Sequence, residues 1–416
     1  MLKKTIPEFI LKKYAVYGIV GLICLFCFIS IFIAPSYMDE LNYHYPLAQS
    51  ISLSQALDPG SDYASAYPPL PYFVANLFLG INNSLIVLRL LNFVIYLLAI
   101  WFFYQLAKKL TQDHLVLTLL FFLNPYLLKA SYMFLLYNWG LLFMLIALNI
   151  YFSKGKWRHW LGDIFLLLAV LCQQWMLVVV LALLLYRLDL YLKKQISLGL
   201  LIKSFAGKLI VFLPAWLLFY SWGGLTHPNF ASHALHPTFE HLNGVLANVG
   251  LLMFFLVLAN FENIWKKSYV LLLLPLPLLW LAIPRHSIGQ GPQEISGVVS
   301  QLATKVDAWL HVPYACTMFF FICVGYLLLL LILQNHEDGL RKIFLYAVLG
   351  FFIAFIASAR LAASHIYISL PLLLLLLRGE IEKMRVTKNI LAVEFFLLST
   401  LYIVYVTFFR SQGISF

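Results

Sequence analysis

The residues with the types and spacing for chemistry lie in one short run, Met38-Asp39-Glu40-Leu41-Asn42-Tyr43-His44-Tyr45-Pro46, directly after the first apolar segment. Charged groups are costly at a membrane surface, so two adjacent carboxylates, Asp39 and Glu40, need a reason. No Lys or Arg lies between Lys13 and Arg89, and we therefore expect neither acid to have an ion-pair partner near it in the sequence. A carboxylate in this setting is a candidate general base toward a hydroxyl group.

The composition shows which kind of protein must position this pair. Apolar residues make up 63% of the 416 positions and charged residues only 11%, against roughly 25% charged residues in a soluble domain. Apolar windows of spanning length predict a single all-α membrane domain over residues 1–416, with about 11–13 transmembrane helices. The basic, apolar start resembles a signal peptide, but Ala34-Pro35-Ser36 is a poor cleavage site, so we expect a retained helix.

The expected spans come from the apolar windows of the sequence. Breaks near Asn124-Pro125 and Gln173-Gln174 are candidates for kinks or re-entrant turns, because several windows are short for a full crossing. The windows are 14–34, 84–106, 113–128, 132–152, 160–172, 174–187, 204–221, 244–264, 268–284, 312–334, 342–358, 364–378 and 389–409.

The net charge of +11 reflects topology and not nucleic-acid binding. With the N-terminus inside, all but six of the 28 Lys and Arg residues fall on the cytoplasmic side, as the positive-inside rule requires. This arrangement attracts anionic lipid headgroups and excludes a nucleic-acid interface as the reason for the charge. The six exceptions are Arg89, Lys129, Arg285, Lys305, Arg360 and Arg410.

The longest predicted connections, 35–83, 221–243 and 285–311, all lie on the outer side, where we expect the active site. In the first of them, Ala66-Tyr67-Pro68-Pro69-Leu70-Pro71-Tyr72 predicts a rigid aromatic element whose prolines bar a regular helix. Its tyrosines suit stacking on sugar rings, or alternatively an interfacial aromatic belt. The five cysteines lie in or at the ends of apolar spans and predict no disulfide framework.

Histidines gather in the second outer connection. Sugar or phosphate binding is the favoured role, while a metal site is the lesser alternative, because the spacing fits no standard ligand pattern. We therefore expect no metal and no cofactor. The residues are His227, His233, His236 and His241.

The order of these features resembles the GT-C superfamily of polyprenyl-phosphate-sugar-dependent glycosyltransferases, multi-helix membrane enzymes with an acidic pair in the first outer loop. Within it, Tyr37-Met38-Asp39-Glu40-Leu41, His44 and Pro46-Leu47-Ala48-Gln49 resemble the opening of the dolichyl-phosphate-glucose α-1,2-glucosyltransferase family, which adds the terminal glucose to the N-glycan lipid precursor. Outline matches follow at Arg89-Leu90-Leu91-Asn92 and Leu361-Ala362-Ala363-Ser364-His365-Ile366-Tyr367. Cys172-Gln173-Gln174-Trp175 departs from the family's Arg-Gln-Thr-Asn-like run.

The resemblance implies an inverting sugar transfer on the outer side. Asp39 would be the base and Glu40 its supporting or acceptor-binding partner, with the reverse assignment open. A guanidinium suits the leaving phosphate, and Arg360 is favoured over Arg285 and Arg89. The remaining implied substrate-binding residues are His44, Tyr67, His233, His236, His365 and Tyr367.

The implied partners are a polyprenyl- or dolichyl-phosphate sugar, with glucose favoured, a glycan or lipid-linked acceptor, and membrane lipids. Another specificity within the superfamily, mannosyl or aminoarabinosyl transfer, is the first alternative. A transporter or flippase is a second, although it would place acids at the bilayer midplane and show repeats. A bacterial or archaeal plasma membrane is favoured over the endoplasmic reticulum because the chain is compact.

Overall fold

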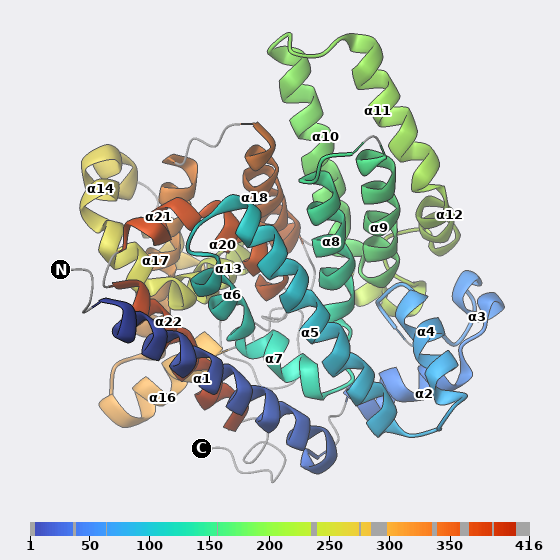
Figure 1. Cartoon of the computed structure of the whole chain (residues 1–416), viewed down its shortest axis with the longest axis horizontal. Helices are drawn as coiled ribbons and strands as arrows, with labels where there is room; N and C mark the ends of the chain where they lie inside the picture. The colour runs from blue at the N-terminus through green and yellow to red at the C-terminus, as the bar shows by residue number, and fades with distance from the viewer. Residues whose placement is uncertain are drawn as a thin grey trace.

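The computed structural model describes residues 5–35, 39–63, 65–155, 157–233, 239–273, 276–283, 298–334, 339–357, 366–384 and 387–404. Within these ranges the chain forms helices and no strand, as the composition predicts (Figure 1). The short helices between residues 45 and 79 lie together at one side of the molecule (Figure 1).

The first half of the chain contains a long N-terminal helix, a group of short helices and a helical bundle. The elements are α1 (Thr5–Ile33), η1 (Glu40–His44), α2 (Tyr45–Ser50), α3 (Leu53–Leu57), α4 (Leu70–Leu79), α5 (Leu85–Leu110), α6 (His114–Phe122), α7 (Pro125–Tyr132), α8 (Tyr137–Tyr151), α9 (Arg158–Cys172), η2 (Gln174–Met176), α10 (Leu177–Leu192), α11 (Leu198–Val211), α12 (Leu213–Trp222) and η3 (Pro228–His233).

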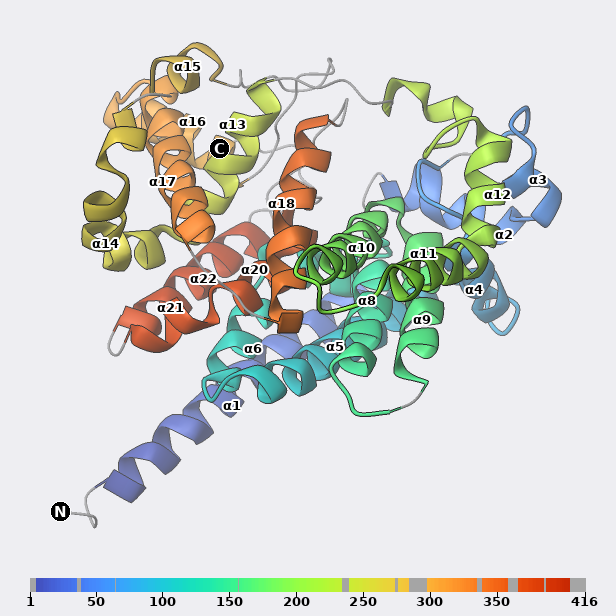
Figure 2. The same cartoon turned by 90° about the horizontal axis from the view of Figure 1, so that it is seen from above.

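The second half adds a further group of helices at the opposite side from α2, α3 and α4 (Figure 2). Its elements are α13 (Phe239–Leu252), α14 (Phe254–Leu273), α15 (Leu276–Leu281), α16 (Val298–Leu310), α17 (Tyr314–Gln334), η4 (Gly339–Arg341), α18 (Lys342–Ala357), η5 (Tyr367–Ser369), α20 (Leu370–Leu376), α21 (Arg378–Lys383) and α22 (Thr387–Val404).

Fewer helices reach spanning length than the apolar windows predict. Among the described residues three are long and apolar enough to cross a membrane, Leu85–Leu110, Gln174–Leu192 and Tyr314–Gln334, and counting three bent pairs as single spans gives six. The described residues therefore show three to six of the expected eleven to thirteen spans, and several further apolar helices are shorter than 18 residues. The helix α8, for example, has 15 residues and is about 22 Å long, shorter than the roughly 30 Å hydrocarbon core. The several long apolar helices are compatible with a multi-pass membrane protein.

Both expected breaks are present. The helices α6 and α7 meet at 61°, where Asn124 caps α7 by accepting hydrogen bonds from the backbone N–H groups of Tyr126 and Leu127, and Pro125 occupies the first turn. At Gln173-Gln174 the chain reverses. Arg187 near the end of α10 lies 3.2 Å from His159 at the start of α9, so these two helices run antiparallel.

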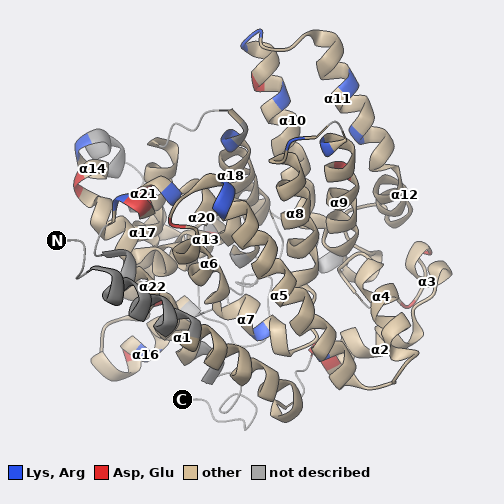
Figure 3. Ribbon diagram, viewed as in Figure 1, with Lys and Arg blue, Asp and Glu red and all other residues tan. Residues whose placement is uncertain are grey.

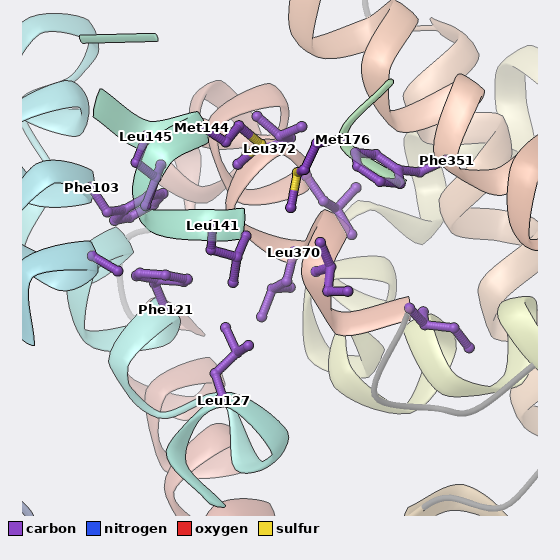
Figure 4. Close-up of a cluster of buried hydrophobic side chains, with 14 of the residues drawn as sticks. Phe103, Phe121, Leu127, Leu141, Met144, Leu145, Met176, Phe351, Leu370 and Leu372 are labelled. Carbon is purple, nitrogen blue, oxygen red and sulfur yellow. The ribbon is translucent and has the colours of Figure 1, made fainter. Parts of the chain in front are cut away.

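The core is made where α5, α6, α7, α8, α18 and α20 meet around η2. Figure 4 shows Phe103, Phe121, Leu141, Met176 and Leu370 within this buried cluster. A second packing contact joins α13 to α17. There Gly250 and Gly325 permit a close approach, because a Cβ atom on Gly325 would lie 1.9 Å from the carbonyl oxygen of Leu246.

Charge is distributed unevenly along the bundle. In Figure 3 the Lys and Arg residues gather at the end where α10 passes to α11 and where α18 begins, and the group of α2, α3 and α4 carries acidic residues without basic ones. At the basic end Lys208 pairs with Asp163 in the buried space between α11 and α9, and Lys342 lies 3.1 Å from Asp189. The group that holds Asp39 and Glu40 therefore lies away from most of the cations.

Candidate active site

The acidic pair lies at the start of one helical stretch, residues 39–50, which begins with a π-turn (η1) and continues as α2. The backbone N–H of Tyr45 bonds to the carbonyl of Glu40, five residues back. Pro46 lacks the N–H group that would bond to the carbonyl of residue 42 in an α-helix. The π-turn directly before Pro46 accommodates this missing donor. Such π-turns are frequent at functional sites.

Glu40 has an ion-pair partner, which corrects the expectation drawn from the sequence. Arg89 of α5 contacts both carboxylate oxygens, with Nε 2.9 Å from Oε1 and Nη2 2.7 Å from Oε2. The backbone N–H of Phe134 donates to Oε1 at 2.6 Å. Both side chains are buried, Glu40 completely. The partner was missed because it lies 49 residues away in the sequence.

The remaining donors of Arg89 bind backbone carbonyls at the end of α1. Nη1 donates to Ile31 at 3.2 Å and to Ala34 at 2.9 Å, and Nη2 reaches Pro35 at 3.4 Å. The five N–H groups of a guanidinium are thus occupied. The predicted role of Arg89 as a phosphate ligand does not fit this arrangement, because no donor is left for a phosphate oxygen.

Asn92, one helical turn after Arg89, organises the neighbouring turn between α7 and α8. Its Nδ2 donates to the carbonyls of Met133 and Leu135 at 2.7 and 2.8 Å, and its Oδ1 accepts from Trp139 Nε1 at 2.6 Å. Through these hydrogen bonds, Arg89 and Asn92 of α5 connect α1, η1 and the turn before α8. Phe134 in that turn then contacts both Glu40 and the ring of His44.

Asp39 lies beside a group of aromatic side chains from the first outer segment. Its negative charge adds to burial in raising the pKa of both Tyr67 and Tyr72. The ring of His44 packs 6.1 Å from that of Tyr67 and 5.9 Å from that of Tyr72. Tyr137, at the start of α8, contacts Tyr67 edge to face at 6.3 Å. The sequence could not reveal this contact with α8, because Tyr137 is far from the acidic pair along the chain.

A buried hydrogen-bond chain supports this group. The hydroxyl of Tyr72 donates to Ser65 Oγ at 2.8 Å, so the 2.7 Å contact between Tyr72 and His44 requires a proton on Nδ1 of the histidine. Burial lowers the pKa of His44 to about 4, and the ring is therefore neutral at physiological pH. Tyr63 fixes the backbone by donating to the carbonyl of Tyr67 at 2.6 Å.

The site thus has two layers. His44, Tyr72 and the Glu40–Arg89 pair are buried and hold one another in place. Asp39 and Tyr67, together with Tyr137, are partly exposed and form the accessible layer. The buried residues hold the accessible carboxylate and its aromatic neighbours in place. A carboxylate flanked by aromatic rings in this way can accept a proton from a bound hydroxyl group while the rings hold a sugar.

The prolines of the aromatic element act partly as expected. Residues 65–69 are irregular, but α4 begins at Leu70 and carries Pro71 in its first turn, where proline is compatible with a helix. The expectation that prolines bar a helix throughout this element was therefore too broad. The irregular part is what exposes Tyr67 toward Asp39.

The second outer segment is anchored on the first. Trp222 Nε1 donates to the carbonyl of Ala56 at 2.8 Å, and His227 Nε2 lies 3.1 Å from the carbonyl of Asp58. His227 is buried between Tyr63 and Trp222. Gly223 ends α12 in the left-handed conformation with φ of 67°, which explains this glycine. His227 is thus a packing residue.

Several predicted site residues are outside the described part of the chain. These are His236, Arg285, Arg360 and His365. His233 and Tyr367 lie in η3 and η5, and only their backbone is described. Within the described ranges, no group of three or more His, Cys, Asp or Glu side chains could hold a metal ion.

A polar pocket opens at the far end of the same helical stretch. It has a volume of about 410 Å³ and is lined by serines, Gln55, Asp58 and Asp62. Gln55 Nε2 donates to Asp62 at 2.8 Å, and its buried Oε1 has no hydrogen-bond partner in the described structure. Hydroxyl, amide and carboxylate groups of this kind suit a neutral polyhydroxyl ligand. Residues 39–50 place this pocket about 16 Å from Asp39 along the helix axis.

Comparisons of this chain with protein-family models, with curated proteins and with solved structures find no match.

Proposed function

We propose that this chain is a membrane glycosyltransferase that moves a sugar, with glucose favoured, from a polyprenyl- or dolichyl-phosphate carrier to a glycan or lipid-linked acceptor. The observation that carries the proposal is the difference between the two adjacent acids. Glu40 is buried and bound at both oxygens by Arg89, whereas Asp39 is partly exposed beside Tyr67 and Tyr72. This difference supports Asp39 as the base and Glu40 as a positioning residue over the reverse assignment.

In the proposed step Asp39 accepts the proton of the acceptor hydroxyl as that oxygen bonds to the anomeric carbon of the sugar. The bond between this carbon and the carrier phosphate breaks, and the carrier leaves as its phosphate. A carboxylate on the attacking side also stabilises positive charge that develops on the sugar ring. One displacement inverts the anomeric centre. Arg360 is the favoured ligand for the leaving phosphate and lies outside the described residues.

The polar pocket beyond α2 supports a glycan acceptor. A saccharide that binds there would reach Asp39 through several sugar units, since the two sites are about 16 Å apart along the helix. This acidic, hydroxyl-lined pocket also suits an uncharged glycan better than an anionic lipid, because Asp58 and Asp62 would repel a phosphate.

The proposal also places the site on the periplasmic or luminal side of a bacterial or archaeal plasma membrane. The absence of Lys and Arg from residues 14–88 supports the outer side. Incubation of the purified protein in detergent with radiolabelled polyprenyl-phosphate sugars tests the function. Consumption of one donor with release of the carrier phosphate is expected, and consumption of mannose or aminoarabinose donors alone would change the sugar assigned. No consumption of any donor would overturn the proposal.

A further inference from the structure

Two adjacent glutamines at the turn between α9 and α10 have polar atoms without hydrogen-bond partners. Gln173 is fully buried, and neither its Oε1 nor its Nε2 meets a partner within the described structure. Gln174 is also buried, and its Oε1 also lacks a hydrogen-bond partner within the described structure. Each buried polar atom left without a partner costs about 1–3 kcal/mol, so three such atoms in two neighbouring residues need an explanation.

Among the other amides of the described residues, Asn138 and Gln55 each leave one buried carbonyl oxygen without a partner, whereas Asn92, Asn149 and Asn243 are paired. Asn92 uses both its amide and its carbonyl oxygen, as described above. Asn149 donates to Phe102 at 2.7 Å and accepts from Lys109 at 3.1 Å. Asn243 donates to the carbonyls of Leu279 and Ala282. Three of the five buried amide atoms without a partner in the described structure thus lie at the α9–α10 turn.

The turn lies next to the proposed active site. Gln174 Nε2 donates to the carbonyl of Ala66 at 2.9 Å, directly before Tyr67. Gln173 packs on α8 at Gly140, where a Cβ atom would lie only 3.0 Å from both Cβ and Oε1 of the glutamine. Tyr137, one helical turn before Gly140, contacts Tyr67. Gln174 is thus hydrogen-bonded to the residue before Tyr67, and Gln173 packs on the helix that carries Tyr137.

We infer that the carboxamides of Gln173 and Gln174 bind hydroxyl groups of the sugar that is transferred, an inference that rests on the proposed function. A sugar hydroxyl donates one hydrogen bond and accepts others, and a carboxamide offers both kinds of group. Sites that hydrogen-bond a substrate hydroxyl discriminate strongly against analogues that lack it, because the site is then left unpaired. These two glutamines therefore select the donor sugar, whereas Asp39 performs the proton transfer.

Access to the carboxamides requires a local movement, since both side chains are buried in this structure. The hydrogen bond from Gln174 to Ala66 is the contact that ties the turn to the irregular residues 65–69. Entry of the sugar would exchange this bond for bonds to the ligand. The unpaired polar atoms destabilise the ligand-free protein. Hydrogen bonds to the sugar remove this penalty and so favour the bound state.

The test combines thermal stability with transfer kinetics for Gln173→Met. Methionine has a similar volume and no polar amide, so the variant should melt no lower than the unsubstituted protein. Its kcat/KM for transfer from the donor identified above should fall about 10–100-fold. Gln105→Met, on a half-buried part of α5 away from the site, is the matched control and should change neither quantity.

Deoxy donors identify the contact. The unsubstituted protein should discriminate against a carrier-linked sugar that lacks one particular hydroxyl, and Gln173→Met should lose that discrimination. Gly140→Ala, which crowds Gln173 without removing it, is a second variant and should also reduce transfer. Unchanged discrimination in Gln173→Met, or a lowered Tm in that variant, would overturn the inference while the glycosyltransferase stands. If the unsubstituted protein consumes no donor, the proposed function itself fails.

Discussion

Arg89 binds both carboxylate oxygens of Glu40 across 49 residues of sequence, and this pair fixes the position of Asp39. The guanidinium also bonds to the carbonyls at the end of α1, so the π-turn, α1 and α5 are joined at one buried point. The two neighbouring acids consequently have different surroundings. One has its charge compensated inside the fold, and the other lies partly exposed among tyrosines.

Glu40→Ala should destabilise the protein strongly, because it leaves the charge of Arg89 buried without its partner. Breaking a buried ion pair costs about 3–5 kcal/mol. We expect a large loss of Tm in detergent and poor recovery of folded protein. Arg89→Ala should destabilise the protein similarly, and the double variant Glu40→Ala with Arg89→Ala should lose less than the sum of the two single changes. Additive losses in this double-mutant cycle would show that the pair does not couple the two helices.

Asp39→Asn should leave the fold intact and stop most of the turnover. Asparagine keeps the shape of the side chain but cannot accept the proton, and general-base assistance is worth typically 10²–10⁴-fold. Turnover should fall by about that factor while donor binding changes little. The exposed Asp307→Asn is the control and should retain full turnover. Near-normal turnover in a folded Asp39→Asn protein would exclude this residue as the base.

The sequence predicted the helical class and the break at Asn124-Pro125, because each depends on local composition or on proline. It did not predict the partner of Glu40 or the contact between Tyr67 and Tyr137. Both bring together residues from separate helices, and nothing in the spacing along the chain indicates such packing. For a related reason, apolar windows do not show where a buried helix such as α8 ends.

The histidine-rich connection shows the same limit. His227 looked like a ligand candidate from its neighbours in sequence, yet its ring packs between Tyr63 and Trp222 and contacts the Asp58 carbonyl. Histidine type and spacing could not separate packing from binding. In contrast, the unpartnered carboxamides of Gln173 and Gln174 carry no sequence signal, because their significance depends on which partners the folded chain fails to supply.

A cysteine placed at Ser61 should react with a membrane-impermeant maleimide in intact cells. The cations at the opposite end of the bundle favour the orientation in which residues 35–83 face the outside. A cysteine at Lys194, in the turn between α10 and α11, should react only after permeabilisation. The background protein should carry Cys316→Ser, because that native cysteine is exposed. Labelling of residue 61 only after permeabilisation would reverse the topology.

Neutral His44 should make the protein less stable as the pH falls. The folded protein holds the pKa of this group at about 4, below the usual value of about 6.5, so the unfolded chain binds the proton more readily. The contribution of His44 is complete above about pH 6.5 and is lost progressively down to about pH 4. We expect the Tm difference between the unsubstituted protein and His44→Gln to shrink over this window. The exposed His311→Asn is the control, and a constant difference for His44→Gln would contradict the assignment.

Changes in the polar pocket should affect long acceptors and spare short ones. Asp62 holds the amide of Gln55, and both residues line the pocket about 16 Å from Asp39 along the helix axis. If the distal part of the acceptor binds there, Asp62→Ala should raise KM for a long oligosaccharide acceptor several-fold while kcat stays constant. A truncated acceptor that cannot reach the pocket should show the same KM in both proteins. Since loss of binding energy far from the reacting atoms can also lower kcat, the comparison of acceptor lengths is the decisive measurement. An equal effect on long and short acceptors would show that Asp62 supports the fold of the first outer segment and does not bind the glycan.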